Sequence, residues 1–182
     1  FAVVQIARLS GDRTRDIEHA HSDGRTVAIH AVTRTEMVLA CGALEAAGVP
    51  SIVLKGVALL ESVYRNIALR PLADVDLLVH REHLEHALTV LAGCGFATER
   101  PELRRGAAGG YDNQLLLFKR GPVPLPLEIH WSLFDSPYYQ QGLDLDWCWQ
   151  AARPLPIGRS AARMLDPIAQ LLHLCGHLVL HH

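Results

Sequence analysis

The 182-residue sequence lacks several features that would assign it quickly to a class of protein. Its four cysteines form no CxxC pair, which argues against a zinc ribbon. Three of them lie in apolar helical patterns, where cysteine behaves as a small core residue, so we expect a reducing, cytoplasmic setting. No run approaches the roughly 18 apolar residues of a membrane-spanning helix, and no membrane association is expected. The formal net charge is only -2, so no basic field indicates nucleic-acid binding.

The composition is that of a folded protein, with 49% hydrophobic and 20% charged residues. The length suits one domain over residues 1–182. Within it we expect an N-terminal helical part at about 13–47, a central core at 51–133 and a C-terminal helical part at 143–182. The chain begins without Met and ends inside an apolar periodic run. We therefore expect it to be a truncated piece of a longer protein.

Periodicity and turn residues predict an α+β fold, in which helices pack against one face of a mixed sheet and further helices flank it at both ends. The expected helices are about 13–47, 57–64, 81–93, 143–152 and one that begins at the Asp-Pro pair 166–167. The expected strands are 51–54, 74–79, 96–99, 115–119 and 127–133. Turns are expected at 55–56, 121–126 and 135–137, a mobile loop at 101–110, and a small hairpin or loop at 154–164.

Asp74 and Asp76 lie two residues apart at the start of a predicted strand. Residues at this spacing point to the same side of a sheet, and the apolar residues between and after them point to the other side. Aspartate is unfavourable inside strands, so the pair needs an explanation. One explanation is that both are strand-end or turn residues. The other, which we favour, is coordination of Mg²⁺, because this cation prefers carboxylate oxygens.

Glu128 and His130 share one side of a later predicted strand, while Leu127 and Ile129 share the other. If this strand lies beside 74–79, Glu128 adds a third carboxylate to the same polar face. Three carboxylates around one or two Mg²⁺ ions are the arrangement used in phosphoryl and nucleotidyl transfer. The alternative is an ordinary solvent-exposed strand face.

Lys55 and Gly56 follow the first predicted strand and precede a helix. Glycine lets the backbone approach phosphate oxygens closely, and a following helix presents free N–H groups. A simple turn glycine explains the pair equally well. The pair is not part of a GxxxxGK[ST] phosphate-binding loop, which the sequence lacks.

Histidines recur at helical spacing in two places, three or four residues apart. On the C-terminal helix a transition-metal site is conceivable, but we favour a polar stripe that faces a cleft or solvent; its members are His173, His177 and His181. On the helix at 81–93 we expect a solvated face, formed by His80, His83 and His86. The arginines of the loop at 101–110 and its flank are either a solvated loop or a basic lid: Arg100, Arg104 and Arg105.

Four blocks of the sequence together resemble a known family. They are LKGVAL, RPLADVDLLV, LEIHWSLF and LLHLCGHLVLHH, in this order. The succession of strand, Lys-Gly, helix, Arg, Asp-x-Asp strand and a later strand with Glu resembles the nucleotidyltransferase superfamily that includes DNA polymerase β. More narrowly, the blocks resemble a family of uncharacterised bacterial nucleotidyltransferases over roughly residues 25–182.

The resemblance implies a minimal nucleotidyltransferase core that moves a nucleoside monophosphate from an NTP, such as ATP, to an acceptor. It implies Asp74, Asp76 and Glu128 as catalytic residues and as ligands of Mg²⁺ or Mn²⁺. Nucleotide-binding residues would be Lys55, Gly56, Arg70 and His130. The acceptor, a small molecule, a protein or RNA, is not identified by any motif, and neither is the oligomeric state.

One departure from the superfamily pattern leaves the activity open. Many members follow the first strand with Gly-Ser or Gly-Gly-Ser/Thr, whose hydroxyl holds phosphates. Here Val57 and Ala58 follow Gly56, so that hydroxyl is missing. The alternative reading is a catalytically weak or inactive module with a binding or regulatory role. A toxin that modifies tRNA or a protein is a third, less favoured reading.

Overall fold

The computed structural model describes most of the chain from the first long helix onward. The described residues are 24–64, 72, 74–98, 113–121, 124–134, 136–155, 157 and 162–181. Arg70, the arginine-rich loop and the segment before residue 24 lie outside them, so the expectations made for those parts stay predictions. No helix among the described residues is long and apolar enough to cross a membrane.

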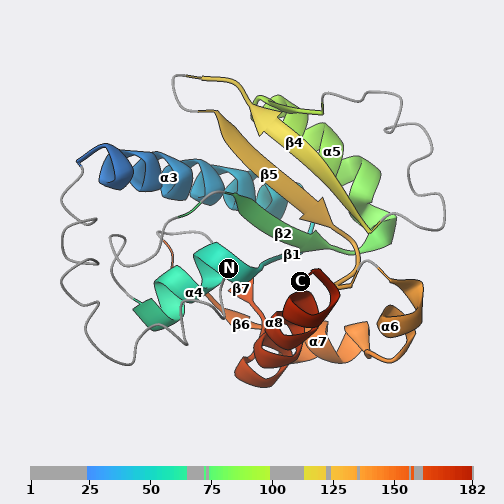
Figure 1. Cartoon of the computed structure of the whole chain (residues 1–182). Helices are drawn as coiled ribbons and strands as arrows, with labels where there is room; N and C mark the ends of the chain where they lie inside the picture. The colour runs from blue at the N-terminus through green and yellow to red at the C-terminus, as the bar shows by residue number, and fades with distance from the viewer. Residues whose placement is uncertain are drawn as a thin grey trace, which may run out of the picture.

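A seven-stranded mixed sheet runs through the described part, in the order β3-β4-β5-β2-β1-β7-β6 (Figure 1). Its strands are β1 (Ser51–Val53), β2 (Val75–Val79), β3 (Phe96–Ala97), β4 (Gln114–Lys119), β5 (Leu125–His130), β6 (Arg153–Pro154) and β7 (Arg163–Met164). The central pair β2 and β5 is parallel, as is the pair β1 and β7, and the other neighbours are antiparallel.

Helices accompany the sheet in chain order. They are α3 (Gly24–Ala46), α4 (Lys55–Leu59), which continues as the π-helix η1 (Leu60–Tyr64), then the 3-10 turn η3 (Arg81–His83), α5 (Leu84–Gly93), α6 (Pro137–Gln141), α7 (Leu145–Ala151) and α8 (Pro167–His181). The architecture is therefore α+β, as the periodicity predicts.

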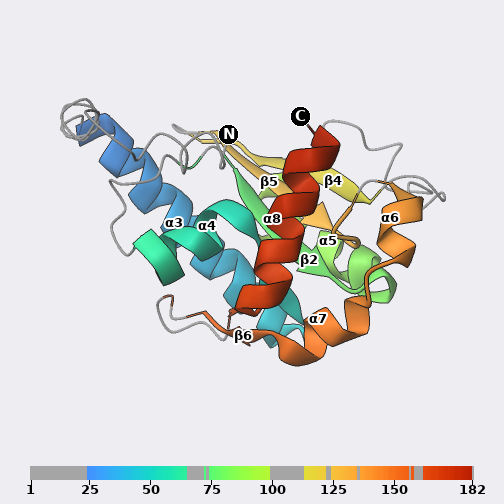
Figure 2. The ribbon, with the colours of Figure 1, turned by 60° about the horizontal axis from the view of Figure 1, so that its bottom comes forward.

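The two faces of the sheet pack against different helices. On β2, the alternate residues Val75, Leu77 and Val79 join a core cluster that includes buried residues of α3 and α5. Leu78 joins a second cluster on the opposite face, together with buried residues from α7 and the start of α8. The face of α3 and α5 is thus separated from the face of α7 and α8 (Figure 1, Figure 2). By period-two alternation, Asp76 points to the latter.

The Lys55-Gly56 pair is not a turn, contrary to the sequence prediction. Helix α4 begins at Lys55, directly after the β1 strand, and Leu54 is its N-cap residue in extended conformation. Lys55 itself has a φ of 39°, in the left-handed region. That conformation costs a non-glycine residue roughly 1–2 kcal/mol, so the surrounding structure must hold it there.

Strand β5 starts and ends earlier than the predicted 127–133. It includes Pro126, expected in a turn, because the parallel pairing with β2 begins only at Leu127 and the missing proline N–H does not interrupt that ladder. It ends at His130, although the N–H of Trp131 still donates to the carbonyl of Asn113 at 2.9 Å. Beyond it, Gln140 Oε1 accepts the backbone N–H groups of Leu133 at 3.0 Å and Phe134 at 3.3 Å.

The helical turn that supplies this glutamine was not expected. The sequence predicts only a turn at 135–137, whereas α6 runs over Pro137–Gln141 with proline in its first turn and Ser136 as N-cap residue. The hairpin at 154–164 is confirmed in the pairing of β6 with β7, and it joins the main sheet through β1.

Candidate functional site

Asp76 and Glu128 lie directly opposite each other on the neighbouring parallel strands β2 and β5. Their sequence neighbours on both strands, including Leu77 and Ile129, belong to the core on the side of α3 and α5. Alternation therefore turns both carboxylates to the other face, and His130 points to that face as well. The prediction that Glu128 joins the aspartate strand from a distant strand is confirmed.

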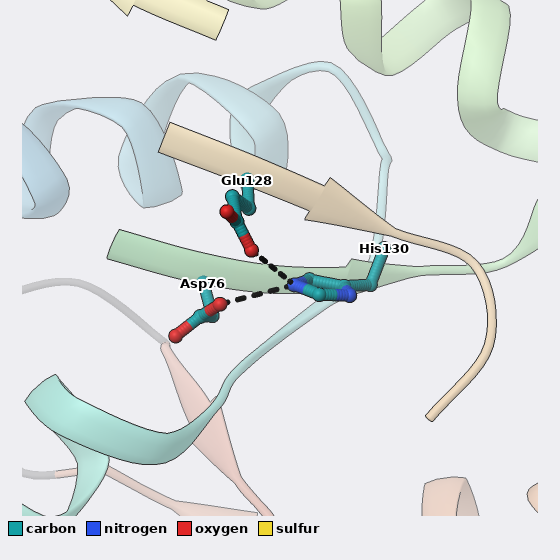
Figure 3. Close-up of side chains that lie close together, drawn as sticks. All are labelled: Asp76, Glu128 and His130. Carbon is teal, nitrogen blue, oxygen red and sulfur yellow. Dashed lines mark hydrogen bonds and ion pairs between the residues drawn. The ribbon is translucent and has the colours of Figure 1, made fainter. Parts of the chain in front are cut away.

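The imidazole of His130 faces both carboxylates, and the same ring nitrogen contacts each of them (Figure 3). Its Nε2 is 3.0 Å from Asp76 Oδ1 and 3.5 Å from Glu128 Oε2. An ionised carboxylate only accepts hydrogen bonds, so Nε2 carries a proton and donates a hydrogen bond to Asp76. One donor atom from each of the three residues lies within 4.8 Å of the others.

Lys55 adds a second cation to the same carboxylate. Its Nζ donates a hydrogen bond to Asp76 Oδ1 at 3.1 Å. The backbone supports this contact, because the N–H of Leu54 donates to the carbonyl of Asp76 at 2.9 Å and ties the end of β1 to β2. The left-handed conformation of Lys55 thus coincides with its ion pair at the site.

The charges at the centre of the site stabilise one another. Burial alone would raise the pKa of Asp76, but the hydrogen bond from His130 and the charge of Lys55 outweigh burial, so the pKa lies well below its usual range. Burial alone would lower the pKa of His130, but its hydrogen bonds to Asp76 and Glu128 outweigh burial and raise it. Asp76 is therefore ionised, and His130 favours its protonated form.

Asp74 lies just before β2, half-buried, and outside the group of donors within 4.8 Å. Burial raises its pKa, and the negative charges of Asp76 and Glu128 raise it further. It is thus electrostatically close to both carboxylates. The structure brings together Asp76, Glu128, His130 and Lys55 of the predicted residues, with Asp74 at their edge.

The residues after Gly56 offer no hydroxyl to a ligand. Gly56, Val57 and Ala58 are buried in α4, and the valine and alanine side chains are only 1% exposed. The nearest hydroxyl along the helix, Ser62 Oγ, donates to the carbonyl of Ala58 at 2.6 Å. Sequence reasoning expected the missing hydroxyl correctly.

Helix α8 brings a residue to this face that sequence reasoning did not select. His173 is 1% exposed, and its ring lies 6.3 Å from those of Phe134 and His177, centroid to centroid. Burial lowers its pKa to about 3, and the charges of Lys55 and His130 contribute in the same direction. The four-residue spacing of the histidines predicts that they share one face of the helix, but it does not predict which of them is buried.

The family comparison agrees with this geometry. A model of a family described as uncharacterised nucleotidyltransferases matches residues 22–182. The chain belongs to this nucleotidyltransferase family. No curated protein and no solved structure matches it significantly.

Nucleotidyl transfer commonly uses a divalent cation, and the residues present suit one. The donors of Asp76, Glu128 and His130 are close enough to share an ion. The two carboxylates favour Mg²⁺ or Mn²⁺. The Nε2 atom of His130 could join them as a ligand only after losing the proton that it donates to Asp76. The nucleotidyltransferase chain thus has a group of side chains that can hold a metal, on the face opposite α3 and α5.

Proposed function

We propose that this chain is a metal-dependent nucleotidyltransferase that moves a nucleoside monophosphate from an NTP to an acceptor. The observation that carries the proposal is the convergence of Asp76, Glu128 and His130 from two parallel strands within 4.8 Å. Family membership supplies the reaction class. The acceptor class, whether small molecule, protein or RNA, follows from neither.

Asp76 and Glu128 would hold the cation, Mg²⁺ or Mn²⁺, with Asp74 at the edge of the site. When bound, such a cation supplies charge neutralisation for the triphosphate and lowers the pKa of an attacking hydroxyl. Lys55 is well placed to pair with phosphate oxygens, because its Nζ already reaches the buried carboxylate of Asp76. Gly56, Arg70 and His130 remain proposed nucleotide-binding residues, and Glu128 is the proposed general base toward the acceptor.

The test replaces Asp76 by asparagine, which keeps the size of the side chain and removes its charge. Outer-shell partners of metal ligands typically contribute about 10- to 100-fold in affinity, so we expect a direct ligand to cost more than about 100-fold. The measurements are Mn²⁺ binding by electron paramagnetic resonance and metal-dependent NTP turnover. Asp146→Asn, an exposed aspartate on α7, is the matched control. Unchanged Mn²⁺ affinity and turnover in Asp76→Asn would refute the proposal.

A second candidate is a binding or regulatory module that keeps the fold without turnover. The buried Val57 and Ala58 favour it, since no hydroxyl stands beside Gly56 to hold a triphosphate. A thermal-shift series with four NTPs and Mg²⁺ separates the two candidates, because a ligand that binds the native state raises its apparent stability. If none of the four NTPs stabilises the protein, the second candidate is favoured.

A further inference from the structure

Helix α8 buries two large polar side chains beside the small Ala169 and leaves several large apolar side chains exposed. Its inner face carries the buried residues Gln170 and His173, which are 6% and 1% exposed. Its outer face carries large apolar side chains that are 47–75% exposed, namely Ile168, Leu171, Leu172 and Val179. A helix packed only for stability buries its apolar side, so the polar inner face needs another explanation.

His173 is a buried polar group on which the charges of the site act. Neither of its ring nitrogens has a hydrogen-bond partner among the residues that the structure describes. Burial of an imidazole without partners is unfavourable, and an apolar side chain of equal size would avoid that cost. The neighbouring core on this face uses such apolar residues, including Leu54 and Leu78.

Close packing holds this imidazole in place. Gly176 lies one turn further along α8, and a Cβ atom added there would overlap the ring of Phe134. The absence of a side chain at Gly176 therefore lets α8 approach the segment that follows β5. This approach brings His173 to the same face as His130 and Asp76, in agreement with their electrostatic influence on its ring.

The field at the ring of His173 is positive. Lys55 and His130 lower its pKa, and Asp76 offsets them only in part. With a pKa of about 3, the imidazole is neutral at physiological pH and is too weak a base to take a proton from a hydroxyl. A neutral ring still has one N–H donor, and in a positive field that donor suits an anionic oxygen.

We propose that His173 is a phosphate-binding residue of the site, which donates its ring N–H to a phosphoryl oxygen of the nucleotide held beside Lys55. Both ring nitrogens are closed to solvent in the structure, so the contact requires a local shift of α8 when the nucleotide binds. The inference rests on the proposed function, because it takes the ligand to be a nucleoside triphosphate. A direct role as metal ligand is not favoured, since His173 does not belong to the donor group within 4.8 Å.

The test compares His173→Leu with His173→Gln. The two replacements are similar in size, but only glutamine keeps an N–H donor. The probes are Mn²⁺ alone and inorganic tripolyphosphate with Mn²⁺, both measured by calorimetry on the full chain. A hydrogen bond to a charged group predicts that the leucine variant binds tripolyphosphate about tenfold or more weakly, and that glutamine restores part of this loss. Mn²⁺ affinity is expected to stay unchanged in both variants.

Gln170→Met is the matched control, because it removes another buried, unpartnered polar group from the same helix. If it weakens tripolyphosphate binding as much as His173→Leu does, helix packing explains the loss and the inference is wrong. Equal tripolyphosphate affinity in wild type and His173→Leu also overturns it, while the proposed function stands. If the wild type binds neither tripolyphosphate nor any NTP, the proposed function fails as well.

Discussion

Replacement of His173 by leucine should make the stability of the protein less sensitive to acid. The folded-state pKa of this imidazole is about 3, against 6.5 for the ordinary group. As the pH falls below 6.5, the unfolded chain takes up a proton that the folded chain refuses, and the free energy of unfolding decreases. Leucine has no such proton to bind, so the variant escapes this loss.

The magnitude follows from the pH interval. At about pH 5 the loss is on the order of 2 kcal/mol, because each pH unit below the unfolded pKa contributes ~1.4 kcal/mol. At about pH 8 neither state carries the proton, and the contribution vanishes. The stability difference between His173→Leu and wild type should therefore shift in favour of the variant by about 2 kcal/mol between these two conditions.

Urea unfolding of both proteins at the two pH values measures this shift. The other titrating groups, including His130, are common to both proteins and cancel to first order in the difference. Gln170→Met serves as the control, because it changes a buried side chain of the same helix that does not titrate, and its effect should be the same at both pH values. A shift below about 0.5 kcal/mol for His173→Leu would mean that the imidazole is not held neutral by burial.

Two further predictions concern how α8 is fixed. Asp166→Ala should lower the free energy of unfolding by about 1–2 kcal/mol, because Asp166 Oδ1 accepts the N–H of Ala169 at 2.9 Å and caps the helix. Chemical denaturation measures this loss, and an unchanged midpoint would contradict the capping role. Gly176→Ala should destabilise the protein by roughly 1–3 kcal/mol although alanine is the better helix former, because its Cβ overlaps the ring of Phe134. Adding Phe134→Leu to this variant should restore part of the loss. If Gly176→Ala alone is more stable than the wild type, the ring of Phe134 moves aside freely and the reasoning is wrong.

The strands of the site could be predicted because a period of two leaves few choices. Once Val75, Leu77 and Val79 are taken as buried, Asp76 must lie on the opposite face, and the structure agrees. The same holds for Glu128 between Leu127 and Ile129. The fold class follows from the same alternation together with the helical repeats.

Contacts that depend on the exact path of the backbone could not be predicted. The sequence does not reveal that Lys55 adopts a left-handed conformation, or that Gln140 accepts two backbone N–H groups of the segment after β5. The helical repeat of His173 and His177 fixes one stripe but not the depth at which each ring lies. That depth depends on how closely α8 approaches, which Gly176 and Phe134 decide in three dimensions.

The internal ion pairs of Asp76 are compatible with a bound cation. Lys55 and His130 both contact the same oxygen, Oδ1. Both of these contacts leave the second oxygen, Oδ2, which is the atom we expect a cation to use. The two protein cations then keep Asp76 ionised before any ligand arrives, and a carboxylate must be ionised to bind a metal. The same two cations create the positive field at His173. Lys55 and His130 thus keep the proposed metal ligand ionised and also favour an anionic oxygen at the proposed phosphate-binding residue.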